Sequence, residues 1–389
     1  MLLIKVIESR LVYRAIVYSA LVLTVSCTRI RNGFIEEGAP VVINLDSSAR
    51  HYSLASLVDS VRAISLETNN NSIISDPVFV KQIIYKNNRY FVFDDKFYAI
   101  KVFDSEGKYL YDLCRLGLGK GESLHIEDIE FDCSRNLVMV LSNRPMKILE
   151  FSLDGHLAKE QTLNFFASGF AFPSVDRRIF YINQNRSEVS SNKNILLTDS
   201  NNVVKSRMFD FPKNIHATSY FSGGLYSTGQ GIFFNPVFSD TFYRMTGDTA
   251  KPAYKTNYSS RNIPPGTPEI EIDKNLKHFS FQYTTFATYR DYIGFNYFGG
   301  IRSAAFFNTR SGRTVTSDIL SDSLNILFSN SMFENDGKLV MVLDLNSLAG
   351  FLQRNAKAIQ QRFPAIYKHI HVPNAKQNPL LLEFVLKEI

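Results

Sequence analysis

Six polar residues have the types that bind ligands or metal ions in proteins: Arg115, Glu122, His125, Asp128, Asn235 and Asn296. Carboxylate and amide oxygens can hold Ca²⁺, and imidazole nitrogens can hold Zn²⁺. A metal ion held in this way can activate water for a hydrolase or lyase reaction. Nothing in their spacing separates these residues from other polar residues of the chain. The metal-assisted reaction is therefore the alternative hypothesis, and we predict no metal ion or cofactor.

Two further motifs lack a residue that their chemistry needs. Gly117–Glu122 is rich in glycine, like a phosphate-binding loop, but no Ser or Thr comes directly after Lys120 and no helix pattern follows the loop. We interpret it as a tight turn in which Glu122 accepts main-chain hydrogen bonds, with a position at a central site as the alternative. His369 and His371 could share a zinc ion, but no third ligand is close in the sequence.

Aspartates recur near predicted strand ends and turns, where this residue most often accepts main-chain hydrogen bonds. The members of this set are Asp94, Asp104, Asp132, Asp154, Asp199 and Asp240. We expect them to stabilise turns rather than to act in catalysis. The sequence also has no Gly-x-Ser-x-Gly motif, which removes one class of serine hydrolase.

A repeat predicts the elements that must position these residues. Asn88–Gly107 recurs 48 residues later as Asn136–Gly155, and each copy reads as strand, turn and strand. Weaker copies follow at 179–201, 231–248, 292–312 and 338–386. A period of about 40–50 residues with this content is typical of a propeller blade, which buries its apolar faces only by stacking on neighbours. The chain from residue 78 onward accommodates six such blades.

The predicted fold is all-β: a six-bladed β-propeller of four-stranded antiparallel blades, with a helical insertion in the last blade. Apolar residues at helical spacing predict one long helix over Ser347–Phe363, ended by Pro364. We expect this insertion, at about 345–370, to pack on one face of the disc. An open ring would leave an unpaired strand edge, and Val61–Leu66 is the strand predicted to close the last blade.

The amino-terminal segment has the pattern of an export signal. Basic residues precede an apolar run, Ala15–Val25, that is too short to span a membrane as a stable helix, and Ser26-Cys27 follows. A small residue before a cysteine at this place predicts lipidation of Cys27, with ordinary cleavage or a buried helix as alternatives. The predicted organisation is a lipoprotein signal peptide over 1–27, a flexible tether over 28–40 and a single propeller domain over 41–389.

Charge and cysteine content limit the expected partners and bonds. The formal net charge is +6, and no basic run with interleaved aromatic residues occurs, so we predict no nucleic-acid partner. Export favours an oxidising compartment, in which Cys114 and Cys133 could form a disulfide or remain separate buried thiols. The sequence has no CxxC or Cys/His cluster, so a structural zinc site is not expected.

Several of these features together resemble one protein family. They are Cys27 at the end of the signal, the strand and turn Ile100–Lys108, the connection Gly117–Glu122 and the strand Phe238–Tyr243. They are similar to those of the six-bladed β-propeller lipoproteins of Bacteroides-like bacteria, relatives of NHL-repeat and TolB-like propellers. The resemblance implies the propeller architecture and a place in the cell envelope, and it implies no general activity.

A complete scaffold without a recognisable catalytic constellation favours a non-catalytic binding or scaffold module over an enzyme. The expected partners are a membrane, through the lipid anchor, and a protein or envelope ligand. Thr28-Arg29-Ile30-Arg31 follows Cys27 in place of the acidic cluster typical of surface export, so we expect a periplasm-facing anchor, with the cell surface as the alternative. The functional site is expected where the copies of the repeat differ, at 116–128, 261–290 and 345–378.

Overall fold

The computed structural model describes residues 31–32, 34–35, 37–45, 50–51, 53–215, 223–318, 322–328, 332–335, 338–370 and 377–387. Asn32–Ile389 form one compact unit. The predicted signal peptide over 1–27, with its Cys27, lies outside the described residues. Among the helices that the structure describes, none is long and apolar enough to cross a membrane.

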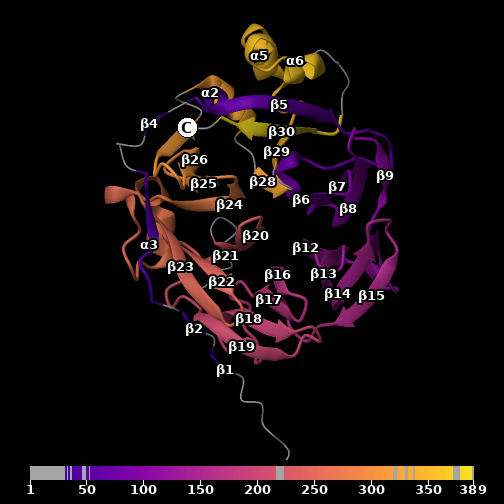
Figure 1. Ribbon diagram of the computed structural model, residues 1–389, viewed down its shortest axis with the longest axis vertical. Helices are drawn as coiled ribbons and strands as arrows, with labels where there is room; N and C mark the ends of the chain where they lie inside the picture. The colour runs from indigo at the N-terminus through magenta and orange to yellow at the C-terminus, as the bar shows by residue number, and fades with distance from the viewer. Residues whose placement is uncertain are drawn as a thin grey trace, which may run out of the picture. The chain divides into compact units, whose positions relative to one another are not determined.

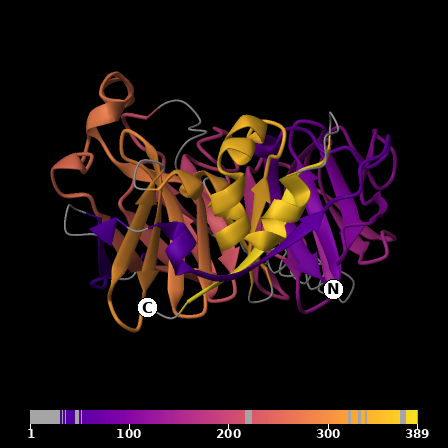
Figure 2. The same ribbon diagram turned by 90° about the horizontal axis from the view of Figure 1, so that it is seen from above.

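Six sheets, each with four neighbouring antiparallel strands, stand as blades in a ring around a common centre (Figure 1). Blade 1 consists of β6 (Val80–Lys86), β7 (Arg89–Asp94), β8 (Ala99–Asp104) and β9 (Tyr109–Asp112). Blade 2 consists of β12 (His125–Asp132), β13 (Leu137–Arg144), β14 (Met146–Ser152) and β15 (Leu157–Thr162). Blade 3 consists of β16 (Gly169–Ser174), β17 (Arg177–Tyr181), β18 (Lys193–Asp199) and β19 (Val204–Asp210). Blade 4 consists of β20 (Gly224–Thr228), β21 (Gly231–Asn235), β22 (Thr241–Thr246) and β23 (Thr249–Asn257). Blade 5 consists of β24 (Phe281–Tyr289), β25 (Tyr292–Phe298), β26 (Arg302–Asn308) and β27 (Thr314–Asp318). Blade 6 consists of β28 (Met332–Asn335), β29 (Lys338–Leu343), β30 (Leu380–Leu386) and β5 (Val58–Ser65). Seen edge-on, the strands run from one face of the disc to the other (Figure 2). The predicted fold class is confirmed.

The turn between the third and fourth strands of a blade explains why the sequence repeats. In blade 1 the Asp104 carboxylate accepts hydrogen bonds from the N–H groups of Glu106 and Lys108, each at 2.9 Å. Gly107 in the same turn has a φ of +87°, and Gly155 in blade 2 has +83°. Residues with a Cβ rarely adopt such angles. The interpretation of recurrent aspartates as turn residues is confirmed here and for Asp94, Asp132 and Asp199.

The ring is closed by a strand from the other end of the chain. β5 pairs antiparallel with β30, with Ala63 opposite Leu382, so the last blade combines three strands from the carboxyl-terminal part with one from the amino-terminal part. The prediction of Val61–Leu66 as the closing strand is confirmed, and the strand begins three residues earlier. Closure in this way pairs the outer edge of β30 and gives blade 6 its fourth strand.

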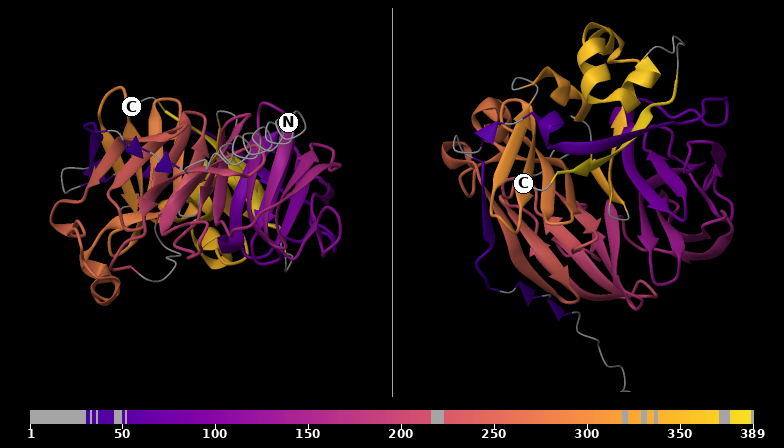
Figure 3. Two further views of the ribbon diagram at one scale, coloured as in Figure 1. Left: turned by 90° about the horizontal axis from the view of Figure 1, so that it is seen from below. Right: turned by 45° about the horizontal axis from the view of Figure 1, so that its top comes forward.

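The segment before β5 adds short parallel strands to the outer edges of two blades. β2 (Phe34–Ile35) and β3 (Val41–Asn44) pair with β23, and β4 (Arg50–His51) pairs with β27. These strands follow the rim of the disc toward β5, as Figure 3 also shows. The remaining short elements are β1 (Arg31–Asn32), α2 (Leu54–Leu57), η1 (Pro77–Phe79), β10 (Arg115–Leu116), β11 (Glu122–Ser123), η2 (Ser259–Arg261), α3 (Glu269–Lys274), η3 (Leu276–His278) and η4 (Ser323–Phe328).

The insertion in the last blade consists of three short helices instead of the one predicted. They are α4 (Ala349–Arg354), α5 (Ala356–Arg362) and α6 (Pro364–Ile370). Asn355 breaks the helix, because its backbone leaves the helical region and its side-chain amide donates to the Phe351 carbonyl at 2.9 Å. α5 ends just before Pro364, as predicted, and Pro364 then begins α6, since the first turn of a helix needs no N–H from that residue.

The place of the insertion also differs from the prediction. Its helix α6 contacts β5, and Figure 1 shows α5 and α6 beyond β5 at the rim of the disc instead of on a face. Leu352, Ile359 and Ile366 supply one buried side chain from each helix to the core of blade 6. The helices therefore cover the outer side of the closing strand, which the sequence pattern could not show.

Apolar side chains fill the junctions between neighbouring blades. Between blades 1 and 2, Val102 on β8 packs in one buried cluster with Val138 on β13. At the junction of blades 2 and 3 the equivalent places are taken by charged residues, Glu150 on β14 and Arg178 on β17. The Glu150 carboxylate lies 3.4 Å from Arg178 Nη2 and 2.7 Å from Arg135 Nη1, and its side chain is 2% exposed.

A second polar group occupies the equivalent places at the junction of blades 6 and 1. The Glu383 carboxylate on β30 lies 3.0 Å from Lys338 Nζ and 3.4 Å from Arg62 Nη1, and it accepts a hydrogen bond from the Tyr90 hydroxyl. Burial alone would raise the pKa of Glu383, but the hydrogen bonds from Tyr90 and Lys338 hold it below its ordinary value. The group links β5, β29 and β30 of blade 6 to β7 of blade 1.

Candidate functional site

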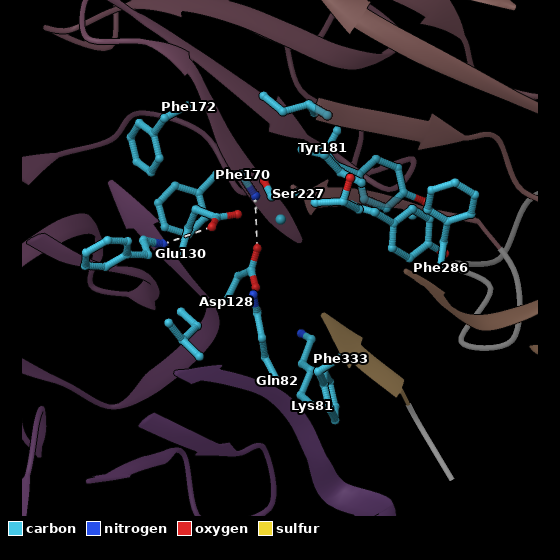
Figure 4. A pocket seen from close by; sticks show the side chains of 18 of the residues that line it. Lys81, Gln82, Asp128, Glu130, Phe170, Phe172, Tyr181, Ser227, Phe286 and Phe333 are labelled. Atoms are coloured by element: carbon cyan, nitrogen blue, oxygen red, sulfur yellow. Dashed lines mark hydrogen bonds between the residues drawn. The ribbon is translucent and has the colours of Figure 1, made fainter. Parts of the chain in front are cut away.

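The innermost strands of the six blades enclose a cavity at the centre of the disc. β6, β12, β16, β20, β24 and β28 contact one another in a ring. The cavity between them has a volume of about 1430 Å³ and is lined by residues of all six strands. We call it the central channel; Figure 4 shows part of its lining. A large cavity of this kind is where a protein most often holds a ligand.

Asp128 presents a carboxyl group to the central channel from β12. Its Oδ2 accepts a hydrogen bond from the Phe170 N–H of β16 at 3.1 Å, which Figure 4 shows, and its Oδ1 accepts one from the Ile129 N–H at 2.9 Å. The surrounding protein removes water and raises the pKa of Asp128 to about 8, although these hydrogen bonds and the charge of Lys81 act in the opposite direction. Near neutral pH this carboxyl group therefore holds a proton for much of the time.

Glu130 follows two residues later, so β-strand alternation brings it to the same side of β12. Its Oε1 accepts a hydrogen bond from the Phe131 N–H at 2.9 Å, and the Ser227 hydroxyl of β20 also interacts with the carboxylate. Removal of water again dominates and raises the pKa of Glu130 to about 7. Two carboxyl groups that titrate near neutral pH thus share the middle of the channel.

One mouth of the central channel carries a cluster of paired charges. Glu127 lies 3.4 Å from Lys81 Nζ of β6 and 3.1 Å from His125 Nε2. The His125 ring packs on Tyr98, with the ring centroids 4.4 Å apart. Glu127 is therefore ion-paired within the described residues, and Asp128 and Glu130 are not.

A protein family model matches most of the chain. A family model described as a domain of unknown function, DUF4934, matches residues 40–383. The chain belongs to the DUF4934 family. The match covers all six blades and the insertion, so the central channel lies within the region common to this family.

Two solved structures are similar to this DUF4934 chain. A proposed exported protein of Bacteroides fragilis has 16% sequence identity and a TM-score of 0.73, over 89% of this chain and 100% of its own. A member of the DUF4221 family from Bacteroides vulgatus has 9% identity and a TM-score of 0.52, over 86% of this chain and 98% of its own. No curated protein matches the chain. At these identities the likeness shows the fold alone.

The DUF4934 fold separates the six residues selected from the sequence. His125 and Asp128 line the central channel. The other four are not among its lining residues: Arg115 on β10, Glu122 on β11, Asn235 on β21 and Asn296 on β25. Asn235 is fully buried, and its side-chain amide donates to the Thr241 carbonyl at 2.8 Å, which holds the turn after β21.

The glycine-rich connection is a turn, as its sequence predicts. Glu122 Oε2 accepts a hydrogen bond from the Gly119 N–H at 2.8 Å. A Cβ on Gly117 would lie 2.1 Å from the same carboxylate oxygen, so only glycine leaves room for Glu122 in the turn. The structural role predicted for Glu122 is confirmed.

Sequence reasoning did not select Glu130, Ser227 or Thr285, which also line the channel. A signal for Glu130 was present, because Asp128 and Glu130 alternate with apolar residues in a segment flanked by turns. Ser227 and Thr285 are ordinary strand residues in the sequence, and only the ring brings them toward β12. Thr285 does fall in the 261–290 segment, and Asp128 in the 116–128 segment, where the site was expected.

The histidine and cysteine residues form neither a metal site nor a disulfide in the part of the chain that the structure describes. Within the described residues, no group of three or more His, Cys, Asp or Glu side chains is placed to hold a metal ion. His371, one half of the predicted histidine pair, lies outside the described residues. Cys114 is buried and Cys133 is exposed, and both are free thiols, so the disulfide that the sequence left open is not formed.

Glu130→Gln is expected to raise the stability of the DUF4934 protein above neutral pH. The pKa of Glu130 is about 7 in the folded protein, against about 4.3 in an unfolded chain. The folded state therefore binds more protons between these values, and the free energy of unfolding falls as the pH rises through them. Glutamine does not titrate, so this fall in the free energy of unfolding is absent from the variant. Near pH 8 we expect the variant to exceed the wild type by about 1.4 kcal/mol or more, the equivalent of one pKa unit.

Denaturant unfolding at about pH 4 and about pH 8 measures this difference. Glu188→Gln, at an exposed position, is the matched control and should change stability at neither pH. A gain for Glu130→Gln that is equally large at both pH values would contradict the assignment of a raised pKa to this carboxyl group.

Proposed function

We propose that this DUF4934 protein is a non-catalytic binding module of the cell envelope, that a lipid anchor holds it to the membrane, and that the central channel holds its ligand. The observation that carries the proposal is the channel of about 1430 Å³, in which Asp128, Glu130 and Ser227 present polar groups from two blades. Cavities with a few convergent polar groups and perturbed pKa values are where proteins most often bind small ligands.

Aromatic side chains in the channel lining support a binding role. Phe172 on β16 and Phe333 on β28 are only half-buried and line the channel. Figure 4 shows both rings around the central space, with Tyr181 and Phe286 on another side of it. Rings of this kind pack against the apolar part of a ligand, while the carboxyl groups orient its polar part.

Blocking the channel tests the proposal. Ser227→Trp places a large ring beside Glu130, and Val175→Trp adds the same ring at an exposed turn outside the channel lining. Protein purified from membranes is denatured, and released small molecules are measured by mass spectrometry. We expect the wild type and Val175→Trp to release the same envelope compound and Ser227→Trp to release none. Equal release of the compound from the wild type and both variants would contradict the proposal.

The lipid anchor is supported by the sequence at Cys27 and by the fold shared with a proposed exported protein. Palmitate labelling of cells that make the wild type or Cys27→Ala tests it. We expect labelled, membrane-bound wild type and an unlabelled Cys27→Ala form. Protease added to intact cells should leave the wild type uncut if the anchor faces the periplasm. Labelling that survives Cys27→Ala would refute the anchor.

The alternative is a metal-assisted hydrolase or lyase with its site at the channel. One observation favours chemistry there: a carboxyl group with a pKa of about 7, such as Glu130, can give and take protons at neutral pH. Metal analysis of the purified protein, followed by assay of the compound released from it with and without added Ca²⁺ or Zn²⁺, separates the two functions. Conversion of that compound by the wild type but not by Glu130→Gln would favour the enzyme.

A further inference from the structure

The central channel is acidic, although the chain as a whole is basic. Its lining contains two lysines, Lys81 and Lys86, against five acidic residues: Asp95, Glu127, Asp128, Glu130 and Glu334. The whole chain carries a formal net charge of +6. A cleft with low-dielectric walls concentrates the field of its own charges, so this channel attracts cations most strongly once Asp128 and Glu130 have lost their protons, although the protein as a whole is basic.

The two central carboxyl groups form no ion pair with the described residues, and Lys81, whose charge acts on Asp128, is paired with Glu127. Neither Asp128 nor Glu130 forms an ion pair with a residue that the structure describes, whereas Glu127 at the mouth is paired with Lys81 and His125. Main-chain N–H groups and the Ser227 hydroxyl are their partners. A carboxylate that is shielded from water normally has a cation beside it, and the channel leaves room for a ligand to bring one to these two half-buried groups.

One hydroxyl group in the channel wall has no hydrogen-bond partner among the described residues. Thr285 on β24 lines the channel from blade 5 and is 7% exposed. No described residue offers its Oγ1 a hydrogen bond. Buried hydroxyl groups are nearly always bonded, so a donor placed beside Thr285 would complete its hydrogen bonding.

We propose that the central channel recognises a ligand through a primary ammonium group, held by Asp128 and Glu130, with Thr285 accepting a further hydrogen bond from the same ligand. This proposal rests on the binding function proposed above and names its ligand class. An ammonium group has three N–H donors and no acceptor, which matches carboxylate and hydroxyl oxygens. The aromatic rings of the lining accommodate the attached hydrocarbon chain and attract the charge.

Binding of the ammonium group is coupled to proton release. Asp128 faces Lys81 of β6 and Glu130 of its own strand; Glu130 faces Asp132 and the Ser227 hydroxyl of β20. An ammonium group between the two carboxyl groups favours their ionised forms and expels the protons that they hold near neutral pH. The affinity for an amine therefore rises with pH between about 6 and about 9, where a primary amine stays charged.

Titration calorimetry of the purified full-length protein with 1,5-diaminopentane tests the proposal, with 1,5-pentanediol as the uncharged probe and CaCl₂ as the metal probe. We expect the diamine to bind, with protons released at neutral pH, and the diol not to bind. Asp128→Asn and Glu130→Gln should each weaken diamine binding at least about tenfold, because each removes a charge-assisted hydrogen bond. Asp176→Asn, at an exposed turn, should leave it unchanged. Melting temperatures of the variants verify that they fold.

Three results would overturn the ammonium assignment: equal binding of the diol, undiminished diamine binding by both channel variants, or binding of Ca²⁺ in place of the diamine. Failure of the diamine to bind at all would also overturn it. The Ser227→Trp release experiment separates this failure from that of the binding function. If the wild type still releases an envelope compound and Ser227→Trp does not, the channel binds a ligand of another class. If the wild type and Ser227→Trp release the compound equally, the proposed binding function is wrong.

Discussion

A Glu150→Gln variant is expected to lose about 3–5 kcal/mol of unfolding free energy, the usual cost of removing one member of a buried ion pair. Glutamine keeps the shape of glutamate but takes the carboxylate away from Arg178, whose side chain is 3% exposed. Arg178 would then keep a hydrogen bond to Asn202. Burial already lowers the pKa of Arg178, which shows that its surroundings disfavour a positive charge. Denaturant unfolding at neutral pH measures the loss.

Glu106→Gln provides the matched control on the surface. Glu106 is paired with Arg62 at 2.7 Å, but its side chain is 79% exposed, so we expect a loss below about 1 kcal/mol. Adding Arg178→Met to Glu150→Gln should restore part of the stability, because the unpaired buried charge is then gone. A loss for Glu150→Gln no larger than that for Glu106→Gln would show that the buried group does not hold blades 2 and 3 together.

A carboxylate in the closing strand is expected to open the ring. Ile64 on β5 is 3% exposed and packs with Tyr90 of blade 1 and Leu381 of β30. Ile64→Asp would lose core packing worth about 2–5 kcal/mol and would also bury an unpaired charge. We expect the free energy of unfolding to fall by at least about 4 kcal/mol. Denaturant unfolding gives the size of the loss, and limited proteolysis reports where the chain opens.

Ser60→Asp tests whether position on the strand, and not the added charge, causes the effect. Ser60 lies on the same strand opposite Val385, and its side chain is exposed. We expect a change within about 0.5 kcal/mol and no new cleavage sites. Equal melting temperatures for Ser60→Asp and Ile64→Asp would mean that β5 adds little to the stability of the ring.

Much of the fold could be predicted from the sequence because each blade is built locally. The turn around Asp104 and Gly107 needs only residues next to one another in the chain, so its pattern recurs wherever a blade does. The closing strand was predictable because a ring must be completed. The break of the insertion at Asn355 was not, because asparagine inside an apolar helical pattern carries no signal that distinguishes an exposed position from a break.

The site was predictable only in part, for a different physical reason. Asp128 could be named from the sequence, but its partners lie on other blades: the Phe170 N–H on blade 3, Ser227 on blade 4 and Thr285 on blade 5. A ring brings one strand from each repeat to its centre. The spacing of residues along the chain does not predict which residues of different blades come close together there. Asn235 and Asn296 have suitable chemistry but lie in the walls of blades instead.

The pairing of β5 with β30 makes the protein sensitive to whether its chain is complete. Arg62 and Glu383, which face each other across this pair, are 321 residues apart. Because the chain is synthesised from its amino end, β5 is made long before its partner β30. Five blades are synthesised before β5 can pair. A product cut short before β30 is not a smaller propeller, because β5 and β29 both keep a bare edge. Ring closure thus separates finished molecules from interrupted ones, because only in the finished molecules are the facing edges of β5 and β30 paired, and the unpaired edges of an interrupted chain are open to proteases and aggregation.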